Sequence, residues 1–389
     1  MTTITVTVGK PAHGGHCVAR HEGRAVFVRH ALPGEVVEAD VADAAPDARF
    51  WNADAVTILE ASPDRVDHPW PEADHGGVGG AELGHVALPA QRAWKAAVLR
   101  ESLQRFAGVD FDGEVQAVPG DDARGGLGYR TRVSAVAGDD GRATMALQGG
   151  KGRLTLTAMP LATPAAEASL LATAGRPGER IDVIETSTGW VHVVRGARGA
   201  GKMLTEKVGD LSYTVSARDF WQVHRGAPAV LVDEVVRRVG TATRVLDLYA
   251  GVGLFAAALA AQGQEVTAVE AVGAKGTSSL ERNLSRFADA RPIIGDTRRT
   301  LMEMARTGED FTNAAVVLDP PRAGAKAATV KAITALSPER IVYVACDPVA
   351  LARDTALLAQ DGYVVDEVTA WDLFPMTHHV EAIATFTRS

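Results

Sequence analysis

The last third of the chain contains three short segments whose side chains could act together in one reaction. They are Asp319-Pro-Pro-Arg322, Cys346-Asp-Pro348 and His378-His-Val-Glu381. Each adjoins an apolar run that is typical of a buried strand, and such strands end at one edge of an open α/β sheet, where ligands bind. We therefore expect the three segments to converge, with the prolines of the first holding Asp319 in a rigid loop.

Cys346 is the candidate nucleophile of this group. It precedes an expected helix start, and a helix N-terminus favours a thiolate and lowers the pKa of a thiol. A strand cysteine can also be a small buried hydrophobe, but the Asp-Pro that follows at the ligand edge favours the nucleophile. Glu381 is the candidate general base, with His378 and His379 as alternatives and a solvated strand glutamate as the ordinary interpretation.

A cofactor site is expected about a hundred residues earlier, in Leu246-Asp-Leu-Tyr-Ala-Gly-Val-Gly-Leu-Phe255. Gly251 and Gly253 permit a tight turn and close approach of a ligand, and Glu270 ends the next strand, where a carboxylate can bind ribose hydroxyls. With Ala256 the pattern also satisfies the dinucleotide fingerprint. Asp247, however, would oppose a pyrophosphate and tolerate a cationic sulfonium, which favours S-adenosylmethionine over a nicotinamide cofactor.

The elements that must position these residues follow a strand–helix alternation from about residue 216. The expected strands are 244–249, 265–270, 292–294, 314–319, 341–346, 363–368 and 380–386, and helices are expected at 254–261 and 328–336. The last two strands are joined by a loop too short for a crossover helix, so they should pair antiparallel. The pattern predicts an α/β domain over 216–389, with a seven-stranded, mostly parallel doubly wound sheet that ends in a hairpin.

Two further regions precede this domain. Residues 1–60 show short alternating strands and Gly-rich turns, which predict a small OB-like β-barrel. Residues 61–215 predict a central α+β domain rich in short strands, and its helix at 88–106 is expected to pack on the catalytic domain.

Composition sets limits on the function. The net charge of −8 argues mildly against nucleic-acid binding, although a local basic patch can lie on an acidic protein. Two distant cysteines exclude a disulfide framework and an all-cysteine metal cage. No metal site and no membrane segment are expected, and we predict a cytoplasmic monomer.

At these residues the sequence resembles the RNA 5-methyluridine methyltransferases, which modify 23S ribosomal RNA and the T-loop of transfer RNA. The N-terminal TRAM domain of that family is similar to the segments 12–20, 23–28 and 31–35, and its central and cofactor-binding motifs resemble Tyr129-Arg-Thr-Arg132 and Phe220-Trp-Gln-Val223. The resemblance implies a Rossmann-like class I methyltransferase domain that binds S-adenosylmethionine. It assigns Cys346 as nucleophile, Glu381 as base, and as cofactor residues Gln222, Tyr249, Glu270, Asp296 and Asp319.

The implied reaction explains why a cysteine is needed. Carbon 5 of uracil is a poor nucleophile, and thiolate addition at carbon 6 makes it reactive, after which a base removes the carbon-5 proton. We favour 23S ribosomal RNA over transfer RNA as the substrate. The candidate phosphate contacts, which ordinary solvation of arginines would explain as well, are Arg20, Arg24, Arg29, His30, Arg130, Arg132, Arg142, Lys151 and Arg153.

Three departures from the family pattern have consequences. Many members hold an iron–sulfur cluster, but the corresponding stretch 68–82 has no cysteine, so we predict none. Leu254 and His224 stand where asparagine is common in the family, which implies a local difference in the contacts to the cofactor. Three alternative functions remain. The first is an adenine amino-methyltransferase, which can use an Asp-Pro-Pro loop and needs no cysteine. The others are a nicotinamide oxidoreductase, which would bind NAD, and an RNA-binding protein without catalysis.

Overall fold

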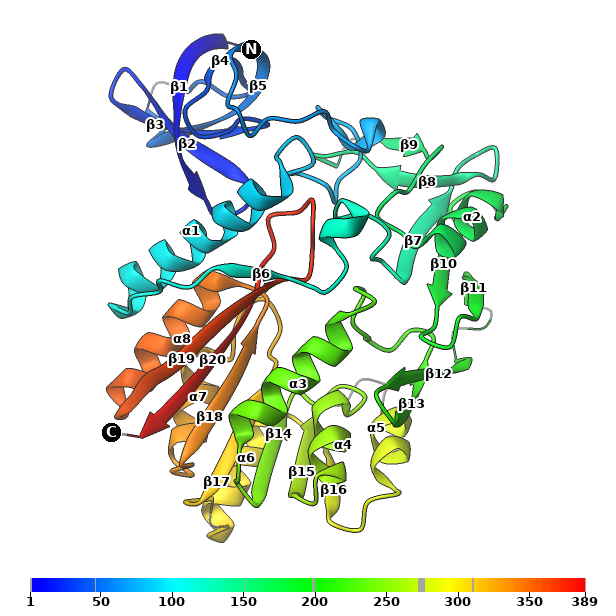
Figure 1. Ribbon diagram of the computed structural model, residues 1–389, viewed down its shortest axis with the longest axis vertical. Coiled ribbons are helices and arrows are strands. Elements are labelled where there is room, and N and C mark those ends of the chain that lie inside the picture. The colour runs from blue at the N-terminus through cyan, green and yellow to red at the C-terminus, as the bar shows by residue number, and fades with distance from the viewer. Residues whose placement is uncertain are drawn as a thin grey trace.

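The computed structural model describes residues 2–45, 47–150, 152–197, 199, 201–271, 277–309 and 311–388. The chain begins with a closed five-stranded barrel, shown in blue in Figure 1, whose strand order is β1-β2-β3-β5-β4. Its strands are β1 (Thr2–Ala12), β2 (His16–His21), β3 (Arg24–Arg29), β4 (Val36–Val41) and β5 (Phe50–Glu60). Alternate residues such as Ile4, Val6 and Val8 are buried inside it, as the period of a strand requires. This confirms the predicted OB-like barrel.

A long helix connects the barrel to the rest of the molecule. After the short helix η1 (Pro71–Ala73), α1 spans Leu88–Ala107 and ends at Gly108, which adopts a left-handed cap. Trp94 and Val98 of α1 belong to the barrel's core, whereas Leu99 and Leu103 belong to the core of the large sheet. The helix is thus buried between two units, and Figure 1 shows the barrel lying over it.

The central region holds two small sheets. The first has five strands in the order β11-β10-β7-β8-β9, covered by α2 (Pro164–Ala172). The second pairs β12 with β13. The bounds are β7 (Arg132–Ala137), β8 (Ala143–Ala146), β9 (Arg153–Thr155), β10 (Arg180–Glu185), β11 (Val191–Arg195), β12 (Met203–Val208) and β13 (Leu211–Ser216), with η2 (Asp122–Arg124) ahead of them.

The C-terminal region forms one eight-stranded sheet in the order β16-β15-β14-β17-β18-β20-β19-β6. Its strands are β6 (Val115–Ala117), β14 (Arg244–Leu248), β15 (Glu265–Glu270), β16 (Ala290–Ile294), β17 (Ala314–Leu318), β18 (Arg340–Ala345), β19 (Tyr363–Asp372) and β20 (Glu381–Arg388). β20 runs antiparallel to both neighbours, whereas the other pairs are parallel. The seven predicted strands and their final hairpin are confirmed. The eighth strand, β6, comes from far earlier in the chain and pairs with β19.

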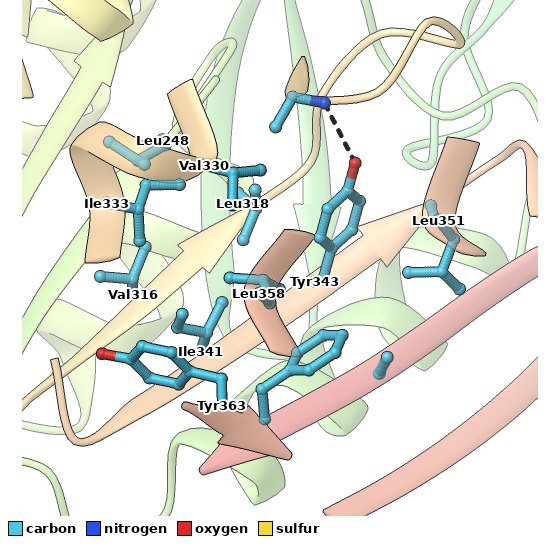
Figure 2. Close-up of a cluster of buried hydrophobic side chains, with 14 of the residues drawn as sticks. Leu248, Val316, Leu318, Val330, Ile333, Ile341, Tyr343, Leu351, Leu358 and Tyr363 are labelled. Carbon is cyan, nitrogen blue, oxygen red and sulfur yellow. Dashed lines mark hydrogen bonds between the residues drawn. The ribbon is translucent and has the colours of Figure 1, made fainter. Parts of the chain in front are cut away.

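Helices cover both faces of this sheet. One face packs against α1, α6 (Thr297–Thr307), α7 (Lys326–Thr334) and α8 (Pro348–Gln360), and the other against α3 (Ala227–Val239), α4 (Leu254–Ala261) and α5 (Thr277–Leu284). Figure 2 shows the first core, where Val330 and Ile333 of α7 meet Leu318 of β17 and the Tyr343 hydroxyl accepts a hydrogen bond from the Ala325 N–H. Among the helices that the structure describes, none is long and apolar enough to cross a membrane.

A buried ion pair fixes α1 to the large sheet. Lys95 of α1 and Asp372 of β19 are both almost completely buried, and Lys95 Nζ lies 2.5 Å from Asp372 Oδ1 and 3.0 Å from the Phe374 carbonyl. Asp372 also begins the loop that leads to Glu381. The pair therefore connects the helix that carries the barrel to the segment that carries a candidate catalytic residue.

Replacing Lys95 by Met should destabilise the protein strongly, because it leaves the Asp372 carboxylate buried without its cation. We expect a loss of about 3–5 kcal/mol in the free energy of unfolding, measured by guanidinium denaturation. The control is Lys10→Met, which removes the exposed pair with Glu101 and should cost at most about 1 kcal/mol. Equal losses in the two variants would contradict this interpretation.

Candidate active site

The structure brings Cys346 and Glu381 face to face across two paired strands. β18 and β20 are antiparallel, and Ala345 lies opposite Ala382. Extending this register by one residue places Cys346 opposite Glu381, where Cα atoms of directly opposed residues are about 4.5–5.5 Å apart. Glu381 is buried and Cys346 is partly exposed. Solvent can therefore reach the thiol of Cys346, whereas the carboxyl group of Glu381 is shielded from solvent.

Asp319 completes this group from the neighbouring strand. β17 pairs with β18 on one side and with β14 on the other, and the Asp319 N–H donates to the Leu248 carbonyl at 3.4 Å. Burial raises the pKa of Asp319 to about 7. Burial, together with the charge of Asp319, raises the pKa of Glu381 well above its usual range. Asp319 is therefore suited to exchange a proton near neutral pH.

The pKa of the Cys346 thiol differs from the sequence prediction. Burial, followed by the charges of Glu381 and Asp319, raises the pKa of Cys346 to about 12. The expected activation by the start of α8 is wrong for the free protein because Asp347 occupies that position. Its Oδ1 atom accepts hydrogen bonds from the N–H groups of Val349 and Ala350, so the helix N-terminus stabilises the Asp347 carboxylate instead.

The raised pKa of Cys346 should make its thiol slow to react with alkylating reagents at neutral pH. Only the thiolate is alkylated by iodoacetamide, so we expect slow modification of Cys346 at pH 7 and a rate that rises about tenfold per pH unit up to the pKa. Glu381→Gln removes the charge that contributes most to the raised thiol pKa after burial, and it should lower that pKa and so accelerate alkylation at a fixed pH. Peptide mass spectrometry would follow the modification, and an unchanged or slower rate in this variant would contradict the account.

His378 and His379, the two alternatives for the general base, each contact another charged side chain. Arg322 Nη2 lies 3.2 Å from His379 Nε2, and because arginine can only donate, His379 must accept there and carry its proton on Nδ1. Burial and the charges of His378 and Arg322 lower the pKa of His379 to about 3, which makes it a weak base. His378 Nδ1 faces Glu82 Oε2 at 3.7 Å. Glu381 is the candidate that faces Cys346 directly.

The predicted cofactor loop follows β14 and has an unusual backbone. Tyr249 adopts a left-handed conformation (φ +60°), which costs energy in a non-glycine residue and often marks a functional site. Gly251 and Gly253 also have positive φ, and a Cβ atom on Gly251 would meet no atom within 4 Å. The loop therefore leaves bare backbone beside open space, as a bound ligand requires.

Asp247, near the end of β14 just before this loop, has a buried carboxyl oxygen without a hydrogen-bond partner among the described residues. Asp247 is completely buried, and its Oδ2 accepts from the Ala256 N–H at 3.0 Å, whereas Oδ1 has no partner among the described residues. A buried acceptor without a partner is costly. Burial raises the pKa of Asp247 far above its usual range. A cationic or hydrogen-donating group of a ligand would satisfy this atom, so the residues of the loop fit a sulfonium cofactor.

The other predicted cofactor residues lie at the ends of the next two strands. Glu270 Oε2 accepts from the Gly251 N–H at 2.7 Å and so fixes the glycine loop, while its Oε1 is free of hydrogen bonds to the described residues. Asp296 caps α6 by accepting from the Arg299 N–H at 2.8 Å, and it lines a surface hollow together with Ala271. Burial, followed by the charges of Asp354, Asp296 and Glu270, raises the pKa of the Tyr249 hydroxyl.

Gln222 and His224 lie apart from this group, whereas Leu254 directly follows the glycine loop. Gln222 is buried and lines a polar pocket with Thr131, Glu206 and Arg225, in which no residue of the glycine loop takes part. His224 accepts from the Gly226 N–H through Nδ1 and contacts Asp121 through Nε2 at 2.9 Å, so both ring nitrogens serve structural bonds. Leu254 packs in the core beside Phe255. The cofactor role of Gln222 stays a prediction.

Local pairing limits which basic residues can meet RNA. Arg132 is mostly buried and binds Glu206, and His30 is buried. Arg29 forms a bidentate ion pair with Asp54, with both hydrogen bonds 2.7 Å long. Arg132 and His30 are therefore unavailable to a phosphate in this arrangement. Arg20 and Arg142 are exposed, and Lys151 lies outside the described residues.

Sequence reasoning missed one neighbour of the nucleophile. His13, at the tip of the barrel, lies with Nε2 3.2 Å from Asp347 Oδ2. In the sequence, His13 is one of four histidine and cysteine residues in a Gly-rich segment, together with His16, Cys17 and His21. Cys17 is in fact buried in the barrel core, and no group of described residues could hold a metal ion.

Comparison with known proteins identifies the family of the chain. A family model described as tRNA (Uracil-5-)-methyltransferase matches residues 297–389, and a TRAM domain model matches residues 1–54. An uncharacterised RNA methyltransferase of Bifidobacterium longum is 38% identical, over 100% of this chain and 97% of that protein. One from Streptomyces coelicolor is 38% identical, over 97% of this chain and 91% of that protein.

A solved structure extends the comparison to the whole fold. The crystal structure of Pyrococcus abyssi tRNA (uracil-54, C5)-methyltransferase in complex with S-adenosyl-L-homocysteine superposes with a TM-score of 0.73 at 21% identity. The match covers 99% of this chain and 100% of that one. The two chains thus share the fold from the barrel to the last strand.

Proposed function

Because the chain belongs to the uracil-5-methyltransferase family of S-adenosylmethionine-dependent RNA methyltransferases, we propose that it methylates carbon 5 of a uridine, with Cys346 as nucleophile and Glu381 as base. We propose 23S ribosomal RNA as the preferred substrate. Transfer RNA is the alternative, supported by the description of the matching family model and by the substrate of the Pyrococcus abyssi enzyme.

One observation carries the proposal: a partly exposed thiol lies directly across a strand pair from a buried carboxyl group. The register of β18 and β20 supports this, as does the influence of the Glu381 charge on the thiol. An adenine amino-methyltransferase would use the Asp319-Pro-Pro loop without a cysteine. The placement of Cys346 beside both acids favours the pyrimidine reaction.

The chain's residues would divide the reaction between them. The target uridine must leave its stack to reach the thiol at the sheet edge. The Cys346 thiol releases its proton to solvent, and the thiolate forms a bond from Sγ to carbon 6 while the electrons of the carbon 5–carbon 6 double bond shift into an enolate with electron density on carbon 5. After carbon 5 is methylated, Glu381 removes the carbon-5 proton, the carbon 5–carbon 6 double bond reforms and the bond to Sγ breaks.

The cofactor residues supply position and charge for this step. S-adenosylmethionine, when bound, provides an electrophilic methyl group on a cationic sulfonium. Gly251 and Gly253 would let it approach the backbone, Glu270 would accept from its ribose, and the carboxyl groups of Asp247 and Asp319 would lie beside the cation. Gln222, Tyr249 and Asp296 are the further residues that we propose to contact it.

The substrate can be identified from RNA of a strain that lacks this protein. Ribosomal and transfer RNA would be digested and compared with wild type by mass spectrometry. We expect loss of 5-methyluridine at one position of 23S ribosomal RNA, restored by the wild-type gene but not by Cys346→Ala. Loss from transfer RNA would support the alternative substrate, and unchanged 5-methyluridine in both would contradict the proposed function.

A further inference from the structure

The tip of the N-terminal barrel reaches two loops of the candidate active site. We call residues 13–15, between β1 and β2, the barrel loop. Gly14 and Gly15 have φ of +91° and +78°, a conformation that residues with a side chain rarely adopt. The loop therefore folds back tightly and extends beyond the barrel toward the edge of the large sheet.

On one side the barrel loop binds the segment that carries the nucleophile. His13 Nε2 lies 3.2 Å from Asp347 Oδ2, and Asp347 directly follows Cys346. The other oxygen of Asp347 accepts the first N–H groups of α8. One carboxylate thus joins the barrel to the turn at which the strand of Cys346 becomes a helix. Burial opposes ionisation of Asp347, but the contact with His13 and these N–H groups outweigh it and lower its pKa.

On the other side the barrel loop touches the segment that leads to Glu381. The His13 ring meets the His378 ring edge-on at 6.2 Å, and a Cβ atom on Gly15 would lie 3.4 Å from His378 Cβ. His378 packs against His379 at 4.2 Å, which in turn accepts from Arg322 of the Asp319-Pro-Pro-Arg322 loop. A continuous series of contacts therefore links the barrel loop to all three segments of the candidate active site, including the one that contains Cys346.

We propose that the barrel loop is a working part of the active site and that His13 is a positioning residue, which holds the Cys346–Asp347 turn in place against the loop of Glu381. The inference rests on the proposed function, because it assigns a role within the same site. It gives the barrel a second task besides contact with RNA. Movement of the barrel by as little as 1 Å would then change the distance between thiol and base, and such a displacement costs about a hundredfold in rate.

The test compares His13→Ala with His13→Gln and with a control on the same barrel. Glutamine retains a side-chain N–H that can donate to Asp347, whereas alanine does not. His21→Ala is the control, because His21 lies at the far end of β2 and packs against Trp51. Each variant would be assayed for RNA affinity, for single-turnover methyl transfer at saturating RNA, and for alkylation of Cys346 by iodoacetamide across a pH series.

We expect His13→Ala to slow single-turnover transfer about tenfold, with RNA affinity within about twofold of wild type. Its alkylation profile should shift to higher pH, because the Asp347 carboxylate beside the thiol loses the hydrogen bond from His13 that offsets part of its negative charge. His13→Gln should recover most of both, and His21→Ala should resemble wild type. A loss of RNA affinity alone, or wild-type behaviour of His13→Ala in both rates, would overturn the inference. Alkylation needs neither RNA nor methyl transfer, so it remains informative if the proposed function fails.

Discussion

Replacing Cys346 by Ala should abolish methyl transfer while leaving cofactor binding intact. Without the thiol no bond to carbon 6 forms, and carbon 5 is not activated. We expect a loss of at least about four orders of magnitude in the single-turnover rate, in line with the removal of a covalent nucleophile. The rate would be measured with radiolabelled S-adenosylmethionine on ribosomal RNA from a strain lacking this protein, and cofactor affinity by calorimetry.

Cys17→Ala is the matched control for this experiment. Cys17 is the other cysteine of the chain, but it is buried in the barrel core, where its sulfur contacts the Ala31 carbonyl. Its loss should reduce stability modestly and leave the methylation rate within about twofold of wild type. Methylation by Cys346→Ala at a comparable rate would mean that the reaction needs no thiol, as expected for an adenine amino-methyltransferase.

Replacing Glu381 by Gln should trap the reaction halfway. The thiol can still add and carbon 5 can still be methylated, but the carbon-5 proton then has no base to remove it. We expect turnover to fall about 10²–10⁴-fold, the usual contribution of general-base catalysis. A covalent protein–RNA complex that survives denaturing electrophoresis should accumulate with unmodified RNA and cofactor.

Glu367→Gln controls for this substitution. Glu367 lies on the adjacent strand β19, where it is exposed and binds Arg237 at 2.8 Å. It should turn over normally and leave no stable complex. If Glu381→Gln turned over at the wild-type rate, another group would have to be the base. A large loss of turnover without any covalent complex would instead mean that Glu381 is needed before or during addition of the thiol to carbon 6.

The sheet and the convergence of its loops could be predicted because both follow from local patterns. Alternating apolar runs identify the seven strands in sequence order, and the short loop after residue 368 requires the antiparallel turn that places Glu381 at the edge of the sheet. Once the order of strands is known, Asp319 and Cys346 must lie at adjacent strand ends. The family resemblance added the roles of these residues.

Contacts between distant segments could not be predicted in this way. β6 has only three residues and no pattern of its own, and it is fixed by pairing with β19 more than 250 positions later. Lys95 appears as an ordinary helix lysine until Asp372 is brought beside it. The same holds for His13 and Asp347. The raised pKa of Cys346 was missed because it depends on burial and on two carboxylates that come from other strands.

The most direct test of the central claim uses RNA that carries 5-fluorouridine at the target position. Fluorine cannot be removed as a proton, so the adduct between the thiol and carbon 6 should persist after methylation. The account predicts a covalent complex whose digestion yields the peptide containing Cys346 joined to one methylated fluorouridine. Recovery of that RNA unmodified, or an adduct on any residue other than Cys346, would contradict it.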